Sequence, residues 1–68
     1  MNMLEEKKRL KNLVGRRFFD SQIGVECRVV EVYHNIYKDV CMKLVYPEGK
    51  TYELVEGSED YYKRFRRL

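Results

Sequence analysis

Residues 40–55, with the sequence VCMKLVYPEGKTYELV, decide the fold that this chain can adopt. From Val40 up to the turn, apolar side chains recur at every second residue, which is the period of a β-strand. Pro47 suits the first central position of a type I turn, and Gly49 suits the left-handed position of a three-residue hairpin loop. The pairing resumes at residues 51–55, so this segment predicts a β-hairpin.

The strand upstream of this hairpin changes phase in its middle. Val25, Cys27 and Val29 lie on one side of a two-residue alternation. Val30 and Val32 lie on the other side. A shift of one residue within a strand is what a β-bulge or a sharp bend produces. Strongly bent second strands are typical of small barrels, in which one strand serves two sheets.

Helical patterns stand at both ends of the chain. The N-terminal segment 1–14 predicts an amphipathic helix over residues 3–14. At the other end, Ser58 suits an N-cap, and the segment 58–68 predicts one to two helical turns that close the sheet. We therefore expect a single domain whose β-barrel occupies residues 15–57.

The layout of these elements resembles a known class of small domains. The run VGRRFFD at 14–20, followed by CRVVEV at 27–32, resembles the opening of SH3-like and Tudor-like barrels. The ending YYKRFR at 61–66 resembles that of small uncharacterised barrel proteins of phages and mobile elements. The resemblance covers residues 14–68. It implies a mostly β, SH3-like antiparallel barrel with an N-terminal amphipathic helix and a short C-terminal helical turn.

Length and composition restrict the classes of protein to be considered. With 68 residues, of which 44% are apolar and 37% charged, the chain suits one small folded domain rather than a disordered segment. No signal peptide is recognisable, and no stretch approaches the roughly 20 apolar residues that cross a bilayer. We expect a cytoplasmic protein that does not contact membranes.

Residue types with catalytic potential are few and scattered. Cys27 and Cys41 stand among aliphatic residues, which predicts two buried thiols, with a cysteine pair or a reactive site as the alternative. The single histidine, His34, has no nucleophile or orienting acid at a suitable spacing, so we interpret it as a rim residue. No metal-ligand spacing occurs either. We predict no enzymatic activity, no metal, no cofactor and no small-molecule substrate.

The charge is distributed unevenly along the chain. Residues 1–17 carry a balance of +4, residues 18–57 a balance of −3 and residues 58–68 a balance of +2. Basic ends that converge on one face would contact phosphates, and tyrosines beside them would stack on unpaired bases. The favoured function is therefore nucleic-acid binding. The candidate residues are Lys7, Lys8, Lys11, Arg16, Arg17, Lys63, Arg64, Arg66, Arg67, Tyr37 and Tyr62.

The alternative function is binding to a protein complex. Exposed sheet edges accept extended peptides, and an apolar stripe on the N-terminal helix suits a partner, a second copy or the helix's own barrel. The stripe consists of Met3, Leu10, Leu13 and Val14. Within the phage resemblance, an adaptor or inhibitor that blocks a host defence complex is one form of this role, and a homodimer is another. An aromatic cage for a methylated lysine is the third possibility.

Overall fold

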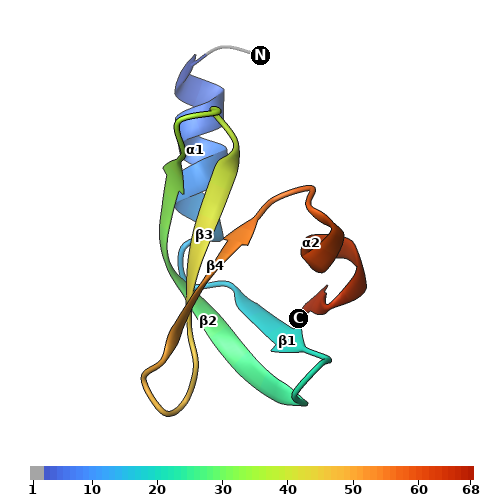
Figure 1. Cartoon of the computed structure of the whole chain (residues 1–68). Helices are drawn as coiled ribbons and strands as arrows, with labels where there is room; N and C mark the ends of the chain where they lie inside the picture. Colours follow the sequence, from blue (N-terminus) through green and yellow to red (C-terminus); the bar gives the residue numbers. More distant parts are fainter. Residues whose placement is uncertain (1–2) are drawn as a thin grey trace.

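The computed structural model describes the backbone of residues 3–68 and the side chains of residues 7–68. It is mostly β, as the sequence predicts. The strands form one antiparallel sheet in the order β4-β3-β2-β1-β5, and the sheet curls into a half-barrel (Figure 1). The elements are, in chain order, α1 (Met3–Leu13), β1 (Arg17–Asp20), β2 (Val25–His34), β3 (Val40–Val45), β4 (Thr51–Val55), α2 (Glu59–Lys63) and β5 (Phe65–Arg67).

The predicted hairpin is confirmed as β3 and β4. Its loop closes with a hydrogen bond from the Tyr46 backbone N–H to the Lys50 carbonyl at 2.9 Å. Gly49 has a φ of 92°, a left-handed conformation that favours glycine because a side chain would be strained there. The turn chemistry of this short segment therefore sets the register of β3 against β4.

The change of phase in β2 is confirmed as a bulge. Val29 pairs with Leu44, but the next pair joins Glu31 to Lys43, so Val30 is the extra residue. Before the bulge, Val29 faces the core; Val30 is 44% exposed. The bulge lets β2 bend, and this long strand then pairs with β1 through its first half and with β3 through its second (Figure 1).

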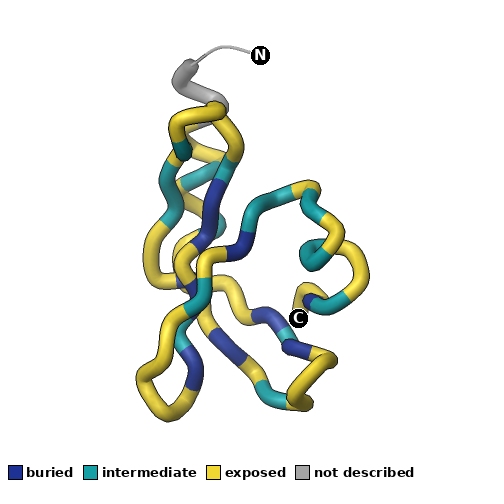
Figure 2. Tube along the Cα trace, viewed as in Figure 1, coloured by how far each residue is buried: buried dark blue, intermediate teal, exposed yellow. Residues whose placement is uncertain are grey.

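The core residues lie mostly within the strands of the curled sheet, where the trace in Figure 2 is dark blue. The buried members of the core come from all five strands and from the residue after β3, and they are Phe18, Cys27, Val29, Met42, Leu44, Tyr46, Leu54 and Phe65. The helix α1 packs on this body through half-buried Leu13. Arg9 of α1 also forms an ion pair with Glu56 at 3.0 Å.

The C-terminal segment differs from its prediction. Ser58 does cap a helix, since its Oγ accepts a hydrogen bond from the Tyr61 backbone N–H at 3.3 Å. However, α2 ends at Lys63, and Phe65–Arg67 forms a fifth strand paired with β1. The predicted helical turn is thus present as α2, but its predicted extension through residue 68 is wrong. An apolar and basic pattern this short fits the period of a helix as well as that of a strand. The free edge of β1 supplies backbone hydrogen-bond partners that favour the strand.

Candidate nucleic-acid interface

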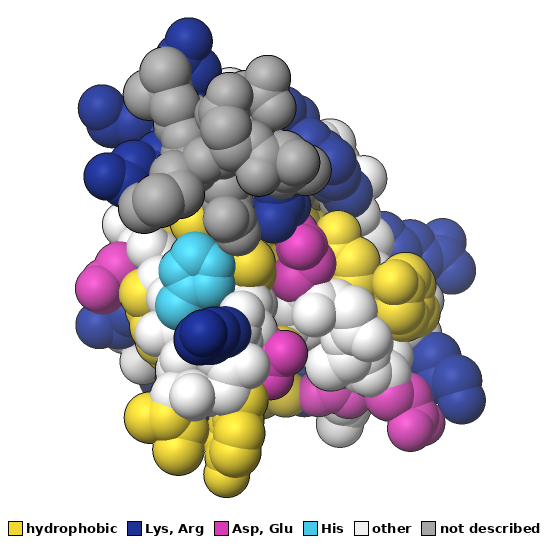
Figure 3. All heavy atoms as spheres, turned by 90° about the horizontal axis from the view of Figure 1, so that it is seen from above, with side chains coloured by type: hydrophobic (Ala, Val, Ile, Leu, Met, Phe, Trp, Pro, Cys, Tyr) yellow, Lys and Arg dark blue, Asp and Glu magenta, His cyan; other side chains and the backbone are white. Residues whose placement is uncertain are grey.

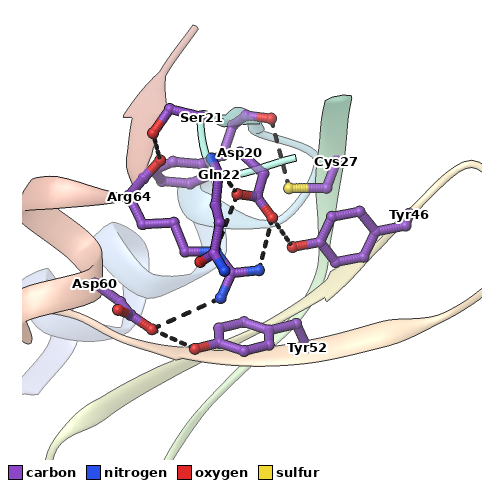
Figure 4. A network of polar contacts seen from close by, with 9 residues as sticks. Asp20, Ser21, Gln22, Cys27, Tyr46, Tyr52, Asp60 and Arg64 are labelled. Atoms are coloured by element: carbon purple, nitrogen blue, oxygen red, sulfur yellow. Dashed lines mark hydrogen bonds and ion pairs between the residues drawn. The ribbon is translucent and has the colours of Figure 1, made fainter. Parts of the chain in front are cut away.

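A buried ion pair fixes the C-terminal segment against the sheet (Figure 4). Asp20, the last residue of β1, is fully buried. Both of its carboxylate oxygens accept hydrogen bonds from the Arg64 guanidinium, each at 2.9 Å. Tyr46 donates its hydroxyl to the same carboxylate at 2.6 Å, and the Gln22 backbone N–H donates at 3.0 Å. This carboxylate therefore meets two donors that are distant in the sequence, Tyr46 and Arg64, and one from its own loop.

Aromatic rings hold the other side of the Arg64 guanidinium. Its Cζ lies 4.7 Å from the centroid of the Tyr52 ring and 5.1 Å from that of Phe65. The Tyr52 hydroxyl donates to Asp60 of α2. The Arg64 carbonyl also accepts from the Ser21 backbone N–H at 2.9 Å and from the Ser21 hydroxyl at 2.6 Å. Arg64 is thus committed to the interior, so it is removed from the candidate phosphate contacts.

The titration of these groups follows from their contacts. The hydrogen bonds from Arg64 outweigh desolvation and lower the pKa of Asp20 to about 2. The same pair raises the pKa of Arg64. Burial, together with the bond to Asp20, raises the pKa of the Tyr46 hydroxyl. Near neutral pH the pair is therefore fully charged, and Tyr46 remains a donor.

Three exposed arginines lie on the outer face of β1, β2 and β5. Opposite residues of an antiparallel pair share a face, and Arg17 of β1 is directly opposite Arg28 of β2. Arg66 of β5 is opposite Phe19, which lies on the same side of β1 as Arg17. All three arginines are exposed. We call Arg17, Arg28 and Arg66 the arginine face.

The opposition of Arg17 and Arg28 is close as well as direct. The Val29 backbone N–H donates to the Arg16 carbonyl at 2.9 Å, whereas the Arg17 carbonyl accepts from the Leu68 N–H at 3.1 Å, on the β5 side of the strand. The next pair along the ladder, Arg17 with Arg28, is then a non-hydrogen-bonded pair, in which side chains lie closest. Glu26 forms an ion pair with Arg17 at 3.0 Å. That carboxylate compensates one of the two opposed charges.

A groove of about 400 Å³ opens on this outer face. Arg17 and Arg28 line it together with Glu26 and Cys27, and its remaining lining is mostly apolar. The apolar part is formed by Val30, Val45, Tyr46 and Pro47. The surface beside the arginine face is therefore hollow and amphipathic.

The structure brings parts of the two basic ends together. Because β5 pairs with β1, Arg66 and Arg67 lie next to the strand that starts at Arg17. Arg16 is exposed at the junction, where its Nε donates to the Asn12 carbonyl of α1 at 3.4 Å. The exposed lysines Lys7, Lys8 and Lys11 lie on α1. In Figure 3, Lys and Arg side chains are most numerous in the upper half of the view, whereas carboxylates lie mostly in the centre and lower half.

The remaining candidates stand outside the arginine face. Lys63 forms an ion pair with Glu59 within α2 at 3.3 Å. Tyr62 lies on α2 and is 73% exposed. Tyr37 is 77% exposed and lies in the turn between β2 and β3. None of the three is carried by β1, β2 or β5, the strands that bear the arginine face.

The predicted apolar stripe is partly used within the chain. Leu13 packs on the core and Leu10 is half-buried, whereas Val14 is 47% exposed. The side chain of Met3 lies outside the described residues. The helix thus packs on its own sheet, which was one of the options left open by the sequence.

The two thiols are buried, whereas the histidine is exposed. Cys27 and Cys41 are buried and unpaired, as predicted. Burial raises the pKa of Cys27 to about 11, so its thiol is protonated and unreactive at neutral pH. His34 is exposed at the end of β2. In the described part of the chain, no three His, Cys, Asp or Glu residues are grouped as metal ligands, and no helix is long and apolar enough to span a bilayer.

Arg28 is absent from the predicted contact residues, because these were chosen from the basic ends of the chain. The signal was present, since Arg28 stands between two residues, Cys27 and Val29, that alternation assigns to the core. An arginine between two inward residues must face outward. Its opposition to Arg17 was not visible, because it depends on the register of β1 against β2.

The chain was compared with protein-family models, with curated protein sequences and with solved structures. None of these three comparisons yields a match.

Proposed function

We propose that this protein is a non-enzymatic binding module whose arginine face contacts the phosphates of a nucleic acid. The observation that carries the proposal is the close opposition of Arg17 and Arg28, with Arg66 on the same face and Glu26 as the nearest compensating charge. Like charges directly opposite each other destabilise a sheet. A feature that opposes stability is expected where a ligand provides the missing countercharge.

The same arrangement supports a small SH3-like barrel as the finer description of the fold. Four strands follow one another as neighbours, and β5 returns to pair with β1 after one helical turn. The bulge bends β2 between its two partners. The two unpaired thiols suit a reducing compartment such as the cytoplasm, which is where we place the protein.

Binding would follow the electrostatics of phosphate neutralisation. Each phosphate that an arginine neutralises releases condensed counterions, so affinity falls as salt rises. Arginine also suits phosphate because its planar guanidinium donates two parallel hydrogen bonds. With three arginines engaged, log K should fall with log salt at a slope of about −2 to −3.

The test is a titration of fluorescently labelled DNA and RNA oligonucleotides, followed by anisotropy at two or more salt concentrations. The variant Arg28→Gln/Arg66→Gln removes two charges from the arginine face. We expect it to weaken binding at least about tenfold and to reduce the salt slope by about 2. The control variant Lys43→Gln/Lys50→Gln removes the same amount of charge from β3 and the β3–β4 loop. It should change the affinity and the salt slope little. Equal weakening by both variants would show that only net charge matters and would overturn the proposal.

A second candidate function rests on the free edge of β4. The Glu56 backbone N–H donates to the Val40 carbonyl, and Tyr46 with Lys50 continues the same ladder. The backbone groups of Thr51 and Glu53 therefore point away from β3, toward an edge beyond which the sheet has no strand among the described residues. A groove of about 310 Å³ runs beside this edge. An extended segment of a partner protein would add a strand there.

The lining of the groove indicates which segment would fit. It carries the carboxylates Glu53, Glu59 and Asp60, so basic side chains complement it. Glu53→Pro removes an outward N–H without touching the β3 ladder, whereas Glu53→Ala keeps that N–H. An alternating Lys-Val peptide should lose binding with the first variant and retain most of it with the second. Equal binding to both variants would exclude strand addition.

A further inference from the structure

We infer that the groove beside the arginine face selects a single-stranded nucleic acid over a duplex. This inference rests on the proposed function and deepens it, because it names the form of nucleic acid. It depends on a different set of side chains, namely the apolar lining of the groove. The two ideas can therefore fail separately.

The apolar lining is built by a local irregularity. Val30 is the extra residue of the β2 bulge and is 44% exposed. It lines the groove with half-buried Val45, the residue directly opposite Arg28 on β3. Bulges commonly redirect a side chain next to a functional site. Here the bulge places an exposed valine beside an arginine, in a position where it contributes little to the core.

Two kinds of surface thus meet within one groove. Arg17 and Arg28 supply positive charge, and Val30, Val45 and Pro47 supply an apolar wall. A duplex presents its phosphates to such a surface but keeps the faces of its bases stacked inside. A single strand presents phosphates together with unstacked bases, which stack on aromatic rings and arginine planes and bury apolar surface against aliphatic side chains. Only the single strand uses both parts of the lining.

The size of the groove agrees with this ligand. Its volume of about 400 Å³ falls in the range of sites that hold small organic molecules, roughly 300–1,000 Å³. Such a space suits one or two nucleotides of a strand. Phe19 adds a half-buried aromatic ring on the same face, opposite Arg66. The strand would thus run across β2 and β1 toward β5.

The test compares labelled dT12 with a 12-base-pair duplex, using the intact chain at one salt concentration. We expect dT12 to bind at least about tenfold more tightly than the duplex, in line with the energy of base packing on side chains. Val30→Ser should weaken dT12 binding about three- to tenfold, leave duplex binding unchanged and leave the salt slope unchanged. Ile36→Ser is the matched control, because Ile36 is also an exposed aliphatic residue, at 89%, but lies in the β2–β3 turn.

The outcomes separate the two ideas. If neither oligonucleotide binds at low salt, the proposed function fails. If both bind equally and Arg28→Gln/Arg66→Gln weakens both, the proposed function holds and the preference for single strands is wrong. If thymidine monophosphate competes as well as dT12, the groove holds a free nucleotide, and the inference is overturned. Circular dichroism of Val30→Ser establishes that the variant is folded.

Discussion

Two arginines from the basic stretches of this chain have opposite environments. Arg64 lies inside the curled sheet, where the Asp20 carboxylate accepts two hydrogen bonds from it and two aromatic rings flank it. Arg17 lies outside, directly opposite another arginine. Charge counted along the sequence therefore does not separate structural cations from cations available to a ligand. What separates the two kinds of cation is the face of the strand on which the side chain lies and the residue opposite it.

The largest expected effect concerns the inner pair. Arg64→Ala leaves the buried Asp20 without its countercharge, and we expect the free energy of unfolding to fall by about 3 kcal/mol. Urea denaturation followed by circular dichroism measures this change. Arg66→Ala, on the exposed face, should stay within about 0.5 kcal/mol of the unmodified chain. Similar losses in both variants would remove the distinction between inner and outer arginines.

Replacing both inner partners sharpens that result. If the loss in Arg64→Ala comes from an uncompensated buried carboxylate, Asp20→Leu/Arg64→Met should recover much of the stability, because neither side chain then needs a countercharge. A double variant as unstable as Arg64→Ala would mean that losing the hydrogen bonds that Tyr46 and Gln22 donate to Asp20 costs as much as the uncompensated carboxylate does.

The next effect is a dependence of stability on pH. The pKa of Asp20 is about 2 in the folded chain and 3.8 ordinarily, so folding favours its ionised form. Its contribution is present above about pH 4 and is lost as the pH falls through 3.8 toward 2. The loss should reach about 2 kcal/mol. Urea midpoints between pH 2 and 5 measure it, and Asp20→Asn should show a shallower slope over that window.

A substitution in the outer pair, Arg17 and Arg28, should raise stability rather than lower it. Arg28→Thr removes the like charge opposite Arg17 and introduces a residue that favours strands, so we expect stability to rise by about 0.2–1 kcal/mol. The same variant should bind oligonucleotides less tightly. Loss of stability together with loss of binding would mean that Arg28 supports the fold and would contradict its assignment as a cation available to a ligand.

The smallest effect tests the neighbour of Arg28 on the inner side of β2. Cys27 is buried, and its pKa is raised to about 11, so a thiol reagent should leave it unmodified in the folded chain at pH 8. It should react at once in urea. Rapid modification under folding conditions would show that this part of β2 opens readily.

Much of the local structure could be predicted from the sequence, for a clear reason. The hairpin loop at Pro47 and Gly49, and the bulge at Val30, depend on residues close together in the chain. The C-terminal segment could not be predicted in this way. Residues 65–67 have no decisive period of their own, and they form a strand because β1 offers a free edge.

Outside residues 65–67, the sequence by itself determined which short segments become strands and turns, since alternation and backbone conformation act over a few residues. Only the tertiary structure decided which residues of distant segments lie opposite each other. The bond between Asp20 and Arg64 spans 44 residues, and the opposition of Arg17 to Arg28 requires the register of β1 against β2. Such pairings form because the curled sheet as a whole is favourable, so they are not encoded in either segment alone.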